Sequence, residues 1–210
     1  MILSAPSGGG KTTIARGLLD ARPDVGYSIS CTTRERRENE VNGRDYHFLS
    51  MEEYLRRKDK GDFAESAVVH GRLYGTLRAE VERVLESGRY VIMDIDVEGA
   101  RQFRNAFADS ISIFVLPPSG EVLLERLRER DTESPESLRQ RMHSALTELR
   151  AVKEYEYVIV NEKLEQAIGD VSSIIDAERL RWKRESGTDN RVQSIVKRLE
   201  RELTSSEKVS

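Results

Sequence analysis

The sequence is poor in cysteine and histidine and contains no long apolar run. One cysteine, Cys31, excludes a disulfide framework and favours a reducing compartment, which we expect to be the cytoplasm. The three histidines are far apart and show no metal-ligand spacing, so we interpret them as ordinary packing or surface residues. No apolar stretch approaches the roughly 20 residues that a membrane span needs, and no basic-then-apolar leader is present. We therefore expect a soluble protein that binds no membrane.

The charge balance lacks an excess of either sign. Basic residues number 34 and acidic residues 37, for a net charge of −3. Such a balance generates no field for non-specific nucleic-acid binding, so we expect no nucleic-acid partner. Any phosphate binding must come from locally placed arginines or backbone amides. The length, 210 residues, is typical of one large domain or of a core with small insertions.

What the sequence does have begins at its N-terminus, with a phosphate-binding P-loop. The run is Ala5-Pro6-Ser7-Gly8-Gly9-Gly10-Lys11-Thr12, with Ala5 in place of the usual first glycine. Glycines let successive backbone N–H groups turn toward phosphate oxygens, the lysine reaches the β- and γ-phosphates, and the threonine hydroxyl can ligate Mg²⁺. Apolar residues 1–3 predict a strand before the loop, and the spacing of Ile14, Leu18 and Leu19 predicts a helix after it. This order makes a chance glycine-rich turn a weak alternative.

Three continuous apolar runs predict a buried parallel sheet: residues 90–96, 111–116 and 157–160. They alternate with helical patterns, which indicates a doubly wound α/β fold. Ligands of such sheets bind at the carboxyl ends of the strands, where the P-loop, Asp94, Asp96 and Asn161 all fall. Asp94 and Asp96 are two residues apart, so we expect their side chains on one face of a strand.

Further local patterns predict the connecting elements. Residues 27–33 alternate and are rich in β-formers, so we expect one strand there. Ser50 and Glu53 form a capping box at the start of a helix, and Thr76 is predicted to cap the next one. Residues 190–204 carry a weak apolar stripe, which predicts a C-terminal helix. That stripe can form a dimer contact or pack on the protein's own core, so both monomer and homodimer remain open.

A loop rich in arginine follows the 27–33 segment. Arg34 and Arg37, with Tyr46 nearby, make a suitable phosphate clamp, because arginine binds phosphate bidentately and keeps its charge. On composition alone a solvated charged loop is the simpler interpretation.

Several segments in order resemble the guanylate kinase family of P-loop nucleoside monophosphate kinases. The main one, residues 28–48, reads Ser-x-Ser-Cys-Thr-Thr-Arg-x-x-Arg-x-x-Glu-x-x-Gly-x-x-Tyr-x-Phe, which is similar to the GMP-binding segment of that family. The likeness continues through residues 63–65, 73–76, 94–99, 114–119, 126–130 and 158–161, and covers the chain from residue 2 to about residue 181. Such a series is far more specific than the P-loop alone.

The resemblance implies a three-part architecture. A P-loop NTPase core, with a parallel sheet flanked by helices, comprises residues 1–30, 76–119 and 157–210. A small mixed α/β insertion for GMP comprises residues 31–75, and a helical lid comprises residues 120–156. The implied reaction is Mg²⁺-assisted, in-line transfer of the ATP γ-phosphoryl group to GMP, and by extension to dGMP. This reaction gives ADP and GDP and is an essential step in guanine nucleotide synthesis and recycling.

The resemblance also assigns site residues position by position. The ATP site is implied to comprise Ala5, Pro6, Ser7, Gly8, Gly9, Gly10, Lys11, Thr12, Thr13 and Asn161, the last as an adenine-side or P-loop-supporting residue. The GMP phosphate is assigned to Arg34, Arg37, Tyr46 and Tyr74, and the guanine to Ser30, Glu65, Thr76 and Asp96; Gly75 is assigned to the GMP site as a whole. Catalysis is assigned to Lys11, Arg34, Arg126, Arg130 and Arg141, and Mg²⁺ to Thr12 and Asp94, directly or through water. For Arg126 and Arg130, a solvated helix face paired with neighbouring glutamates is the alternative.

The chain departs from the family pattern within the arginine loop. Arg36 stands where proline is usual, and Glu38-Asn39 replaces Pro-Gly; Asp131 also stands where glycine is common.

Two other functions stay open: a guanylate-kinase-like phosphopeptide-binding module without catalysis, and a kinase of a ribose bisphosphate. The intact Gly8–Thr12 run opposes the first, and the threonine-arginine loop with Glu65 and Tyr74 opposes the second.

Overall fold

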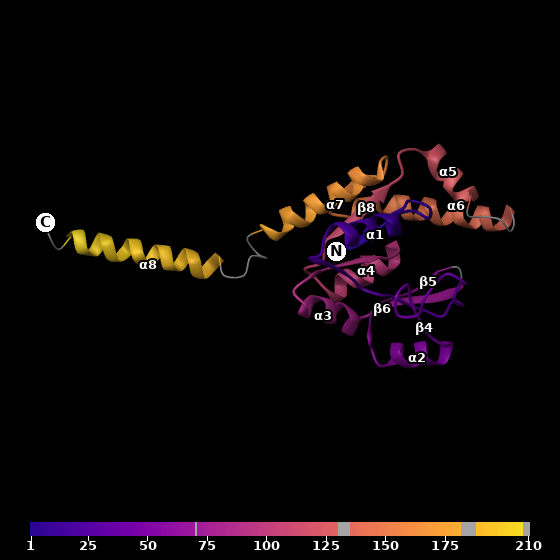
Figure 1. The fold of residues 1–210 in the computed structure, drawn as a ribbon, viewed down its shortest axis with the longest axis horizontal. Helices are drawn as coiled ribbons and strands as arrows, with labels where there is room; N and C mark the ends of the chain where they lie inside the picture. Colours follow the sequence, from indigo (N-terminus) through magenta and orange to yellow (C-terminus); the bar gives the residue numbers. More distant parts are fainter. Residues whose placement is uncertain (70, 130–134, 182–187, 208–210) are drawn as a thin grey trace. The chain divides into compact units, whose positions relative to one another are not determined.

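The computed structural model describes residues 1–69, 71–129, 135–181 and 188–207. By compactness the chain divides into two units, residues 1–168 and residues 169–210. The first unit contains both sheets and every residue discussed as a candidate site. Figure 1 shows the elements and their labels.

A parallel five-stranded sheet forms the centre of the first unit. Its order is β2-β7-β1-β8-β9, and all neighbouring pairs are parallel. The strands are β1 (Ile2–Ser4), β2 (Val25–Tyr27), β7 (Tyr90–Asp94), β8 (Ser112–Leu116) and β9 (Tyr157–Val160). This confirms the expected α/β class with a parallel sheet. The strands come together because β1, β7 and β8 consist almost wholly of buried apolar residues.

Helices pack on this sheet through apolar stripes. Helix α1 (Lys11–Ala21) contacts β1 and β7 and buries Ile14, Ala15 and Leu18. Helix α3 (Arg78–Glu86) contacts β7, and α4 (Val97–Ala106) contacts β1. The spacing of these buried residues is that of one helix face, which is the reason for the packing.

A second, smaller sheet forms the segment between β2 and α3. Its order is β4-β3-β6-β5, from β3 (Cys31–Thr32), β4 (His47–Phe48), β5 (Phe63–Val69) and β6 (Arg72–Leu77). Helix α2 (Met51–Asp59) lies against β5, and the Ser50 hydroxyl caps it by accepting the Glu53 N–H at 3.1 Å, as predicted. Strand β5 packs on α4, so the small sheet is held by the core.

Two helices follow β8. Helix α5 (Gly120–Glu129) packs on α6 (Pro135–Arg150) through Leu123, Leu127 and Ala145, and the 3₁₀ helix η1 (Ala151–Glu154) leads to β9. Helix α7 (Leu164–Arg179) begins in the first unit and continues in the second.

Helix α8 (Thr188–Glu207) extends beyond the predicted 190–204 at both ends. Its Val192, Ile195, Val196 and Leu199 are exposed. Among the described residues, none of the helices is both long enough and apolar enough to cross a bilayer.

The prediction of one strand over residues 27–33 is wrong. Strand β2 ends at Tyr27, and β3 begins only at Cys31, in the other sheet. The Ser28 N–H still donates to the Ile92 carbonyl at 3.2 Å, but the Ser30 carbonyl accepts from the His47 amide of the small sheet. Residues 28–30 therefore carry the chain from one sheet to the other, which local alternation cannot reveal.

Three local predictions near the sheet edges are also corrected. Thr76 lies within β6 and caps no helix, because its hydroxyl donates to Glu65; the N-cap of α3 is Leu77. Asp96 lies beyond β7 and caps α4 by accepting the Gly99 N–H at 2.7 Å, so Asp94 and Asp96 do not share a strand face. Strand β9 lies at the sheet edge, and Val158 and Val160, which share one face of the strand, are about half exposed, whereas Ile159 on the other face is buried.

Candidate functional site

The P-loop connects β1 to α1, as the sequence predicts. Gly8 and Gly10 have φ values of 86° and 90°, a left-handed conformation that favours glycine. The Gly9 N–H donates to the Pro6 carbonyl at 2.7 Å and closes the turn. Ala5 is buried, and a side chain at Gly9 would lie 2.7 Å from its methyl group, so Ala5 fills the space beneath the loop. The loop thus presents backbone N–H groups at the start of a helix, where an anion is stabilised.

Asn161 supports this loop from the end of β9. Its Nδ2 donates to the Gly9 carbonyl at 3.1 Å, and the residue is buried. A Cβ at Gly10 would lie 2.3 Å from the same Nδ2 atom. Of the two roles implied for Asn161, the geometry therefore agrees with support of the P-loop.

The helices α5 and α6 place charged groups against the P-loop. Arg141 Nη2 donates to the Ser7 hydroxyl at 3.3 Å, and the Ser7 N–H donates to Glu148 Oε2 at 2.9 Å. The Cβ of Arg126 lies 3.4 Å from where a Gly8 Cβ would be. Its Nη1 atom is buried, and among the described residues it has no hydrogen-bond partner. A buried guanidinium nitrogen without a partner is suited to an anion such as a phosphate.

Arg130, the other predicted arginine of this segment, lies outside the described residues. Glu148 was not predicted from the sequence. Its burial raises the pKa of its carboxyl group. A glutamate within a charged helix gives no local signal that sets it apart from its solvated neighbours.

Asp94 lies at the carboxyl end of β7, beside the first turn of α1. The Thr12 hydroxyl donates to Asp94 Oδ2, and the Tyr27 hydroxyl donates to Asp94 Oδ1. Because the Thr12 hydroxyl donates its hydrogen bond to the carboxylate, the lone pairs of its oxygen remain available to a cation.

Oxygen ligands of this kind fit Mg²⁺, which is held by one or two protein oxygens together with substrate phosphates. No cluster of three or more histidine, cysteine or acidic side chains that could hold a metal occurs within the described part of the chain. Two protein oxygens, from Thr12 and Asp94, suit a cation that arrives with a nucleotide.

The arginine loop is organised around one carboxylate, Glu40. Arg34 Nη2 lies 2.7 Å from Glu40 Oε1, and the Arg37 N–H donates to Glu40 Oε2 at 2.8 Å. The hydrogen bond from Arg34 lowers the pKa of the Glu40 carboxyl group. Arg36 Nη1 donates to the Glu40 carbonyl at 3.0 Å, so this unusual residue helps hold the loop.

The side chain of Arg37 extends into solvent, and the described structure records no ion pair or hydrogen bond for its guanidinium. Of the two arginines of the predicted clamp, Arg34 is paired with Glu40, whereas the Arg37 side chain has no recorded partner among the described residues.

Aromatic rings line the inner side of this loop. The Arg34 guanidinium carbon lies 5.5 Å from the Tyr46 ring centre, and the Tyr46 and Tyr74 rings meet edge to face at 5.9 Å. Burial, with a smaller contribution from the Asp94 carboxylate, raises the pKa of Tyr46 to about 12. Tyr46 therefore stays protonated as a hydrogen-bond donor near neutral pH. It lies close enough to Asp94 for the negative charge of that carboxylate to raise its pKa.

The four residues assigned to the base come together behind the rings. The Thr76 hydroxyl donates to Glu65 Oε1 at 2.7 Å and lies 3.4 Å from the Ser30 hydroxyl. Glu65 is 4% exposed, and burial, together with the charge of Asp96, raises its pKa to about 7. A Cβ at Gly99 would lie 2.8 Å from Glu65 Oε2, so glycine is needed there to leave room for the carboxylate.

Tyr54 holds the strand on which this group depends, and it was not predicted. Its hydroxyl donates to the Tyr74 carbonyl at 2.6 Å, and it lies 2.5 Å from where a Cβ at Gly75 would be. The backbone between Tyr74 and Thr76 is therefore fixed by a buried hydroxyl from α2. In the sequence, Tyr54 is one apolar position of an amphipathic helix, and that position predicts core packing but no hydrogen bond to a strand.

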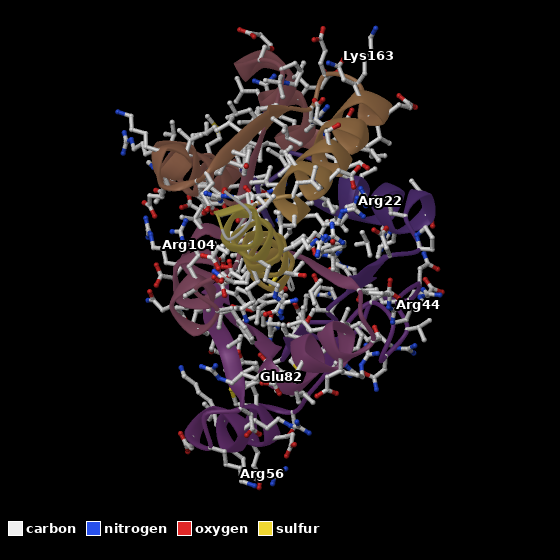
Figure 2. The ribbon with its side chains drawn as sticks, turned by 90° about the vertical axis from the view of Figure 1, so that its left-hand side faces the viewer. Arg22, Arg44, Arg56, Glu82, Arg104 and Lys163 are labelled. Carbon is white, nitrogen blue, oxygen red and sulfur yellow. The ribbon has the colours of Figure 1, made fainter. Side chains whose placement is uncertain are left out.

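The P-loop region and the arginine loop are in contact within the first unit. Arg16 of α1 lies 3.4 Å from Asp45, near the end of the arginine loop. Within the core sheet, Tyr27, the last residue of β2, donates a hydrogen bond to Asp94. By contrast, charged side chains such as Arg56 and Lys163 extend from the periphery in Figure 2. The P-loop, Asp94 and Asn161 follow or end strands of the core sheet. Glu65, Tyr74 and Thr76 belong to the second sheet.

Comparison with known proteins gives a consistent result. The family model for guanylate kinase matches residues 1–178. The guanylate kinase of Paramagnetospirillum magneticum is 46% identical over 188 residues, covering 89% of this chain and 88% of that protein. The guanylate kinase of Chromobacterium violaceum is 45% identical over 180 residues, covering 86% of each chain. The crystal structure of guanylate kinase from Anaplasma phagocytophilum is similar with a TM-score of 0.75 and 34% identity, covering 92% of both chains.

Proposed function

The chain belongs to the guanylate kinase family, and from this premise we propose how its side chains share the transfer of the ATP γ-phosphoryl group to GMP. The protein is a nucleoside monophosphate kinase that produces ADP and GDP. We propose the roles of individual residues and the use of Mg²⁺ from the geometry of the site, and the extension to dGMP from the family resemblance.

The donor nucleotide binds at the P-loop. Backbone N–H groups of residues 5–13 and the Lys11 ammonium hold the ATP phosphates, with Asn161 keeping the loop in shape. Arg126 and Arg141 stand beside Ser7 and Gly8, and they stabilise the negative charge of the phosphoryl group in transit. Arg130 is proposed to join them from outside the described residues.

The acceptor nucleotide binds in the 31–75 segment. Arg34, Arg37, Tyr46 and Tyr74 hold its phosphate, and this clamp reduces the repulsion between two polyanions. Ser30, Thr76, Asp96 and the Gly75 backbone surround the base together with Glu65. The Glu65 carboxylate can accept the N1–H and the exocyclic N–H of guanine at once, whereas adenine offers no such pair of donors. A wrong base leaves buried polar groups unpaired, which supplies the discrimination.

The nucleophile is an oxygen of the GMP phosphate. A phosphate monoester has its second pKa near about 6, so this oxygen is already anionic near neutrality and no general base is required. Catalysis then depends on positioning and on charge stabilisation. Thr12 and Asp94 would hold Mg²⁺, directly or through water, and the ion would supply further neutralising charge. We propose that the 31–75 and 120–156 segments close over the nucleotides, which keeps water from the γ-phosphoryl group.

One observation carries this assignment: the acceptor segment holds a buried carboxylate, Glu65, which accepts a hydrogen bond from the Thr76 hydroxyl, and the same chain carries an intact P-loop. A phosphate-binding core alone does not require such a group. Monomer and homodimer are both compatible with the proposal, and the single cysteine favours the cytoplasm.

An acceptor survey tests the assignment. ADP release is followed in a coupled assay with GMP, dGMP, AMP, UMP and ribose phosphates. We expect turnover with GMP, and then with dGMP. ADP release without any acceptor, or only with a sugar phosphate, contradicts the proposal and favours the ribose bisphosphate kinase. Absence of all turnover, with binding of a phosphopeptide, favours the inactive module.

A further inference from the structure

Asp94 receives a hydrogen bond that the roles above leave unexplained. Its Oδ2 accepts from the Thr12 hydroxyl, which belongs to the P-loop helix. Its Oδ1 accepts from the hydroxyl of Tyr27, which belongs to β2 and has no part in the nucleotide contacts described so far. Each carboxylate oxygen therefore has its own donor, from a different element of the core.

The sheet brings Tyr27 to this position. Strands β2 and β7 are parallel neighbours, and Tyr27 is paired with Ile92. Asp94 is two residues beyond Ile92 and points to the same face of the sheet, about 6.6 Å further along the strand. A tyrosine can cross that distance with its hydroxyl, whereas a serine or threonine cannot. Tyr27 is also the last residue of β2, so its ring lies at the edge where the nucleotides are proposed to bind.

A carboxylate with one donor can rotate about its terminal torsion, which is broad and roughly two-fold. Donors on both oxygens fix its plane, so the remaining lone pairs keep one direction relative to Thr12. Geometry of this kind matters most for Mg²⁺, which demands near-ideal octahedral coordination. Hydrogen-bond partners of metal-ligating carboxylates commonly tune affinity for the metal.

We propose that Tyr27 is a positioning residue for the cation that accompanies the nucleotide, acting through Asp94. The inference rests on the proposed function of the P-loop site. Tyr27 touches neither nucleotide; it holds the Asp94 carboxylate in the orientation that receives Mg²⁺ or its bound water.

The test compares Tyr27→Phe with Tyr90→Phe. Tyr90 lies at the opposite end of β7, and the described structure records no hydrogen bond for its hydroxyl. Each variant loses one hydroxyl from the same pair of strands and keeps its ring. The measured quantity is the ratio of the ADP dissociation constant in EDTA to that in saturating Mg²⁺, obtained by isothermal titration calorimetry.

We expect Tyr27→Phe to lower this ratio by about tenfold, which is the effect of losing one hydrogen bond to a charged group. The ADP dissociation constant in EDTA should stay near that of the wild type. Tyr90→Phe should leave the ratio unchanged. An unchanged ratio in Tyr27→Phe, or equal weakening with and without Mg²⁺, overturns the proposal, because the latter indicates only a structural role.

A double-mutant cycle with Asp94→Asn keeps the proposal testable if Tyr27→Phe is less stable. If Tyr27 acts through Asp94, the Phe substitution lowers the ratio no further in the Asp94→Asn background. Additive losses overturn the proposal. Wild-type protein that binds ADP with a Mg²⁺-dependent gain but does not phosphorylate GMP contradicts the proposed function and leaves the role of Tyr27 standing.

Discussion

The proposed donor and acceptor halves of the site are built in different ways to hold phosphate. The P-loop is mostly backbone, with Gly8 and Gly10 in left-handed conformations and Asn161 bonded to the loop from beneath. The arginine loop offers side chains from a solvated segment. There the Glu40 carboxylate forms an ion pair with Arg34 and accepts a hydrogen bond from the Arg37 backbone N–H. The first is pre-organised by packing; the second keeps its shape through an internal carboxylate.

This difference indicates where each half is sensitive to substitution. A backbone cradle tolerates changes of its side chains, as Ala5 shows, but not a change of its conformation. A side-chain clamp tolerates changes of its loop, as Arg36 shows by bonding to the Glu40 carbonyl, but not the loss of an arginine. Four substitutions or titrations test this comparison, from the largest expected effect to the smallest.

Lys11→Ala should have the largest effect, because this ammonium is the one side-chain charge that the P-loop itself brings to the transferred group. We expect kcat to fall by about 100- to 1,000-fold, the range for removing one transition-state donor. Steady-state ADP release measures the effect. Lys163→Ala, at the exposed periphery in Figure 2, is the matched control and should retain wild-type activity. Near-normal turnover of Lys11→Ala contradicts its role.

Arg37→Ala should weaken the acceptor half selectively. Loss of a charge-assisted contact to the GMP phosphate should lower kcat/KM for GMP by about 10- to 100-fold, with the KM for ATP within about twofold of wild type. Arg56→Ala on α2 removes an exposed arginine whose recorded partner, Glu53, belongs to the same helix, and it serves as the control. Equal losses for both substrates indicate that Arg37 does not belong to the acceptor clamp alone.

Glu65 should make GMP binding dependent on pH. Burial raises its pKa to about 7, so the carboxyl group ionises between about pH 6 and 8. Guanine donors require the ionised form, so the KM for GMP should fall by about tenfold over this range as pH rises. The KM for ATP is the internal control. In Glu65→Gln the pH dependence of the KM for GMP should disappear and GMP binding should weaken. If the substitution leaves this pH dependence unchanged, the Glu65 carboxyl group is not its cause.

The raised pKa of Glu65 has the opposite effect on folding stability: rising pH should strengthen GMP binding but lower the free energy of unfolding. The folded-state pKa exceeds the unfolded value of about 4.3, so the folded protein binds more protons between these two values. The free energy of unfolding should therefore fall as pH rises through that interval. Glu65→Gln should lack this component, which urea unfolding at several pH values can measure.

Asn161→Ala should have the smallest effect. It removes one neutral hydrogen bond to the Gly9 carbonyl, which corresponds to about a threefold to tenfold increase in the KM for ATP. The KM for GMP should not change. An increase that disappears when a different purine triphosphate replaces ATP assigns Asn161 to the adenine and not to the loop.

Local patterns predicted much of the fold and of the site. The P-loop, the Ser50 cap and the apolar runs of β7 and β8 depend on neighbours in sequence, so they can be inferred from sequence. The errors lie where a distant partner decides. The chain leaves one sheet for another after Tyr27, and the Thr76 hydroxyl turns to Glu65 instead of capping a helix.

The sequence by itself determined the chemistry of this protein: a glycine-rich cradle with Lys11, an arginine loop, and acids at the ends of buried strands. Only the tertiary structure decided which groups support one another. Tyr27 reaches Asp94, Glu148 meets the Ser7 amide, and Tyr54 fixes the Tyr74 backbone across 67, 141 and 20 positions of sequence, respectively. Hydrogen bonds between such distant positions depend on strand order and helix packing, which no local pattern encodes.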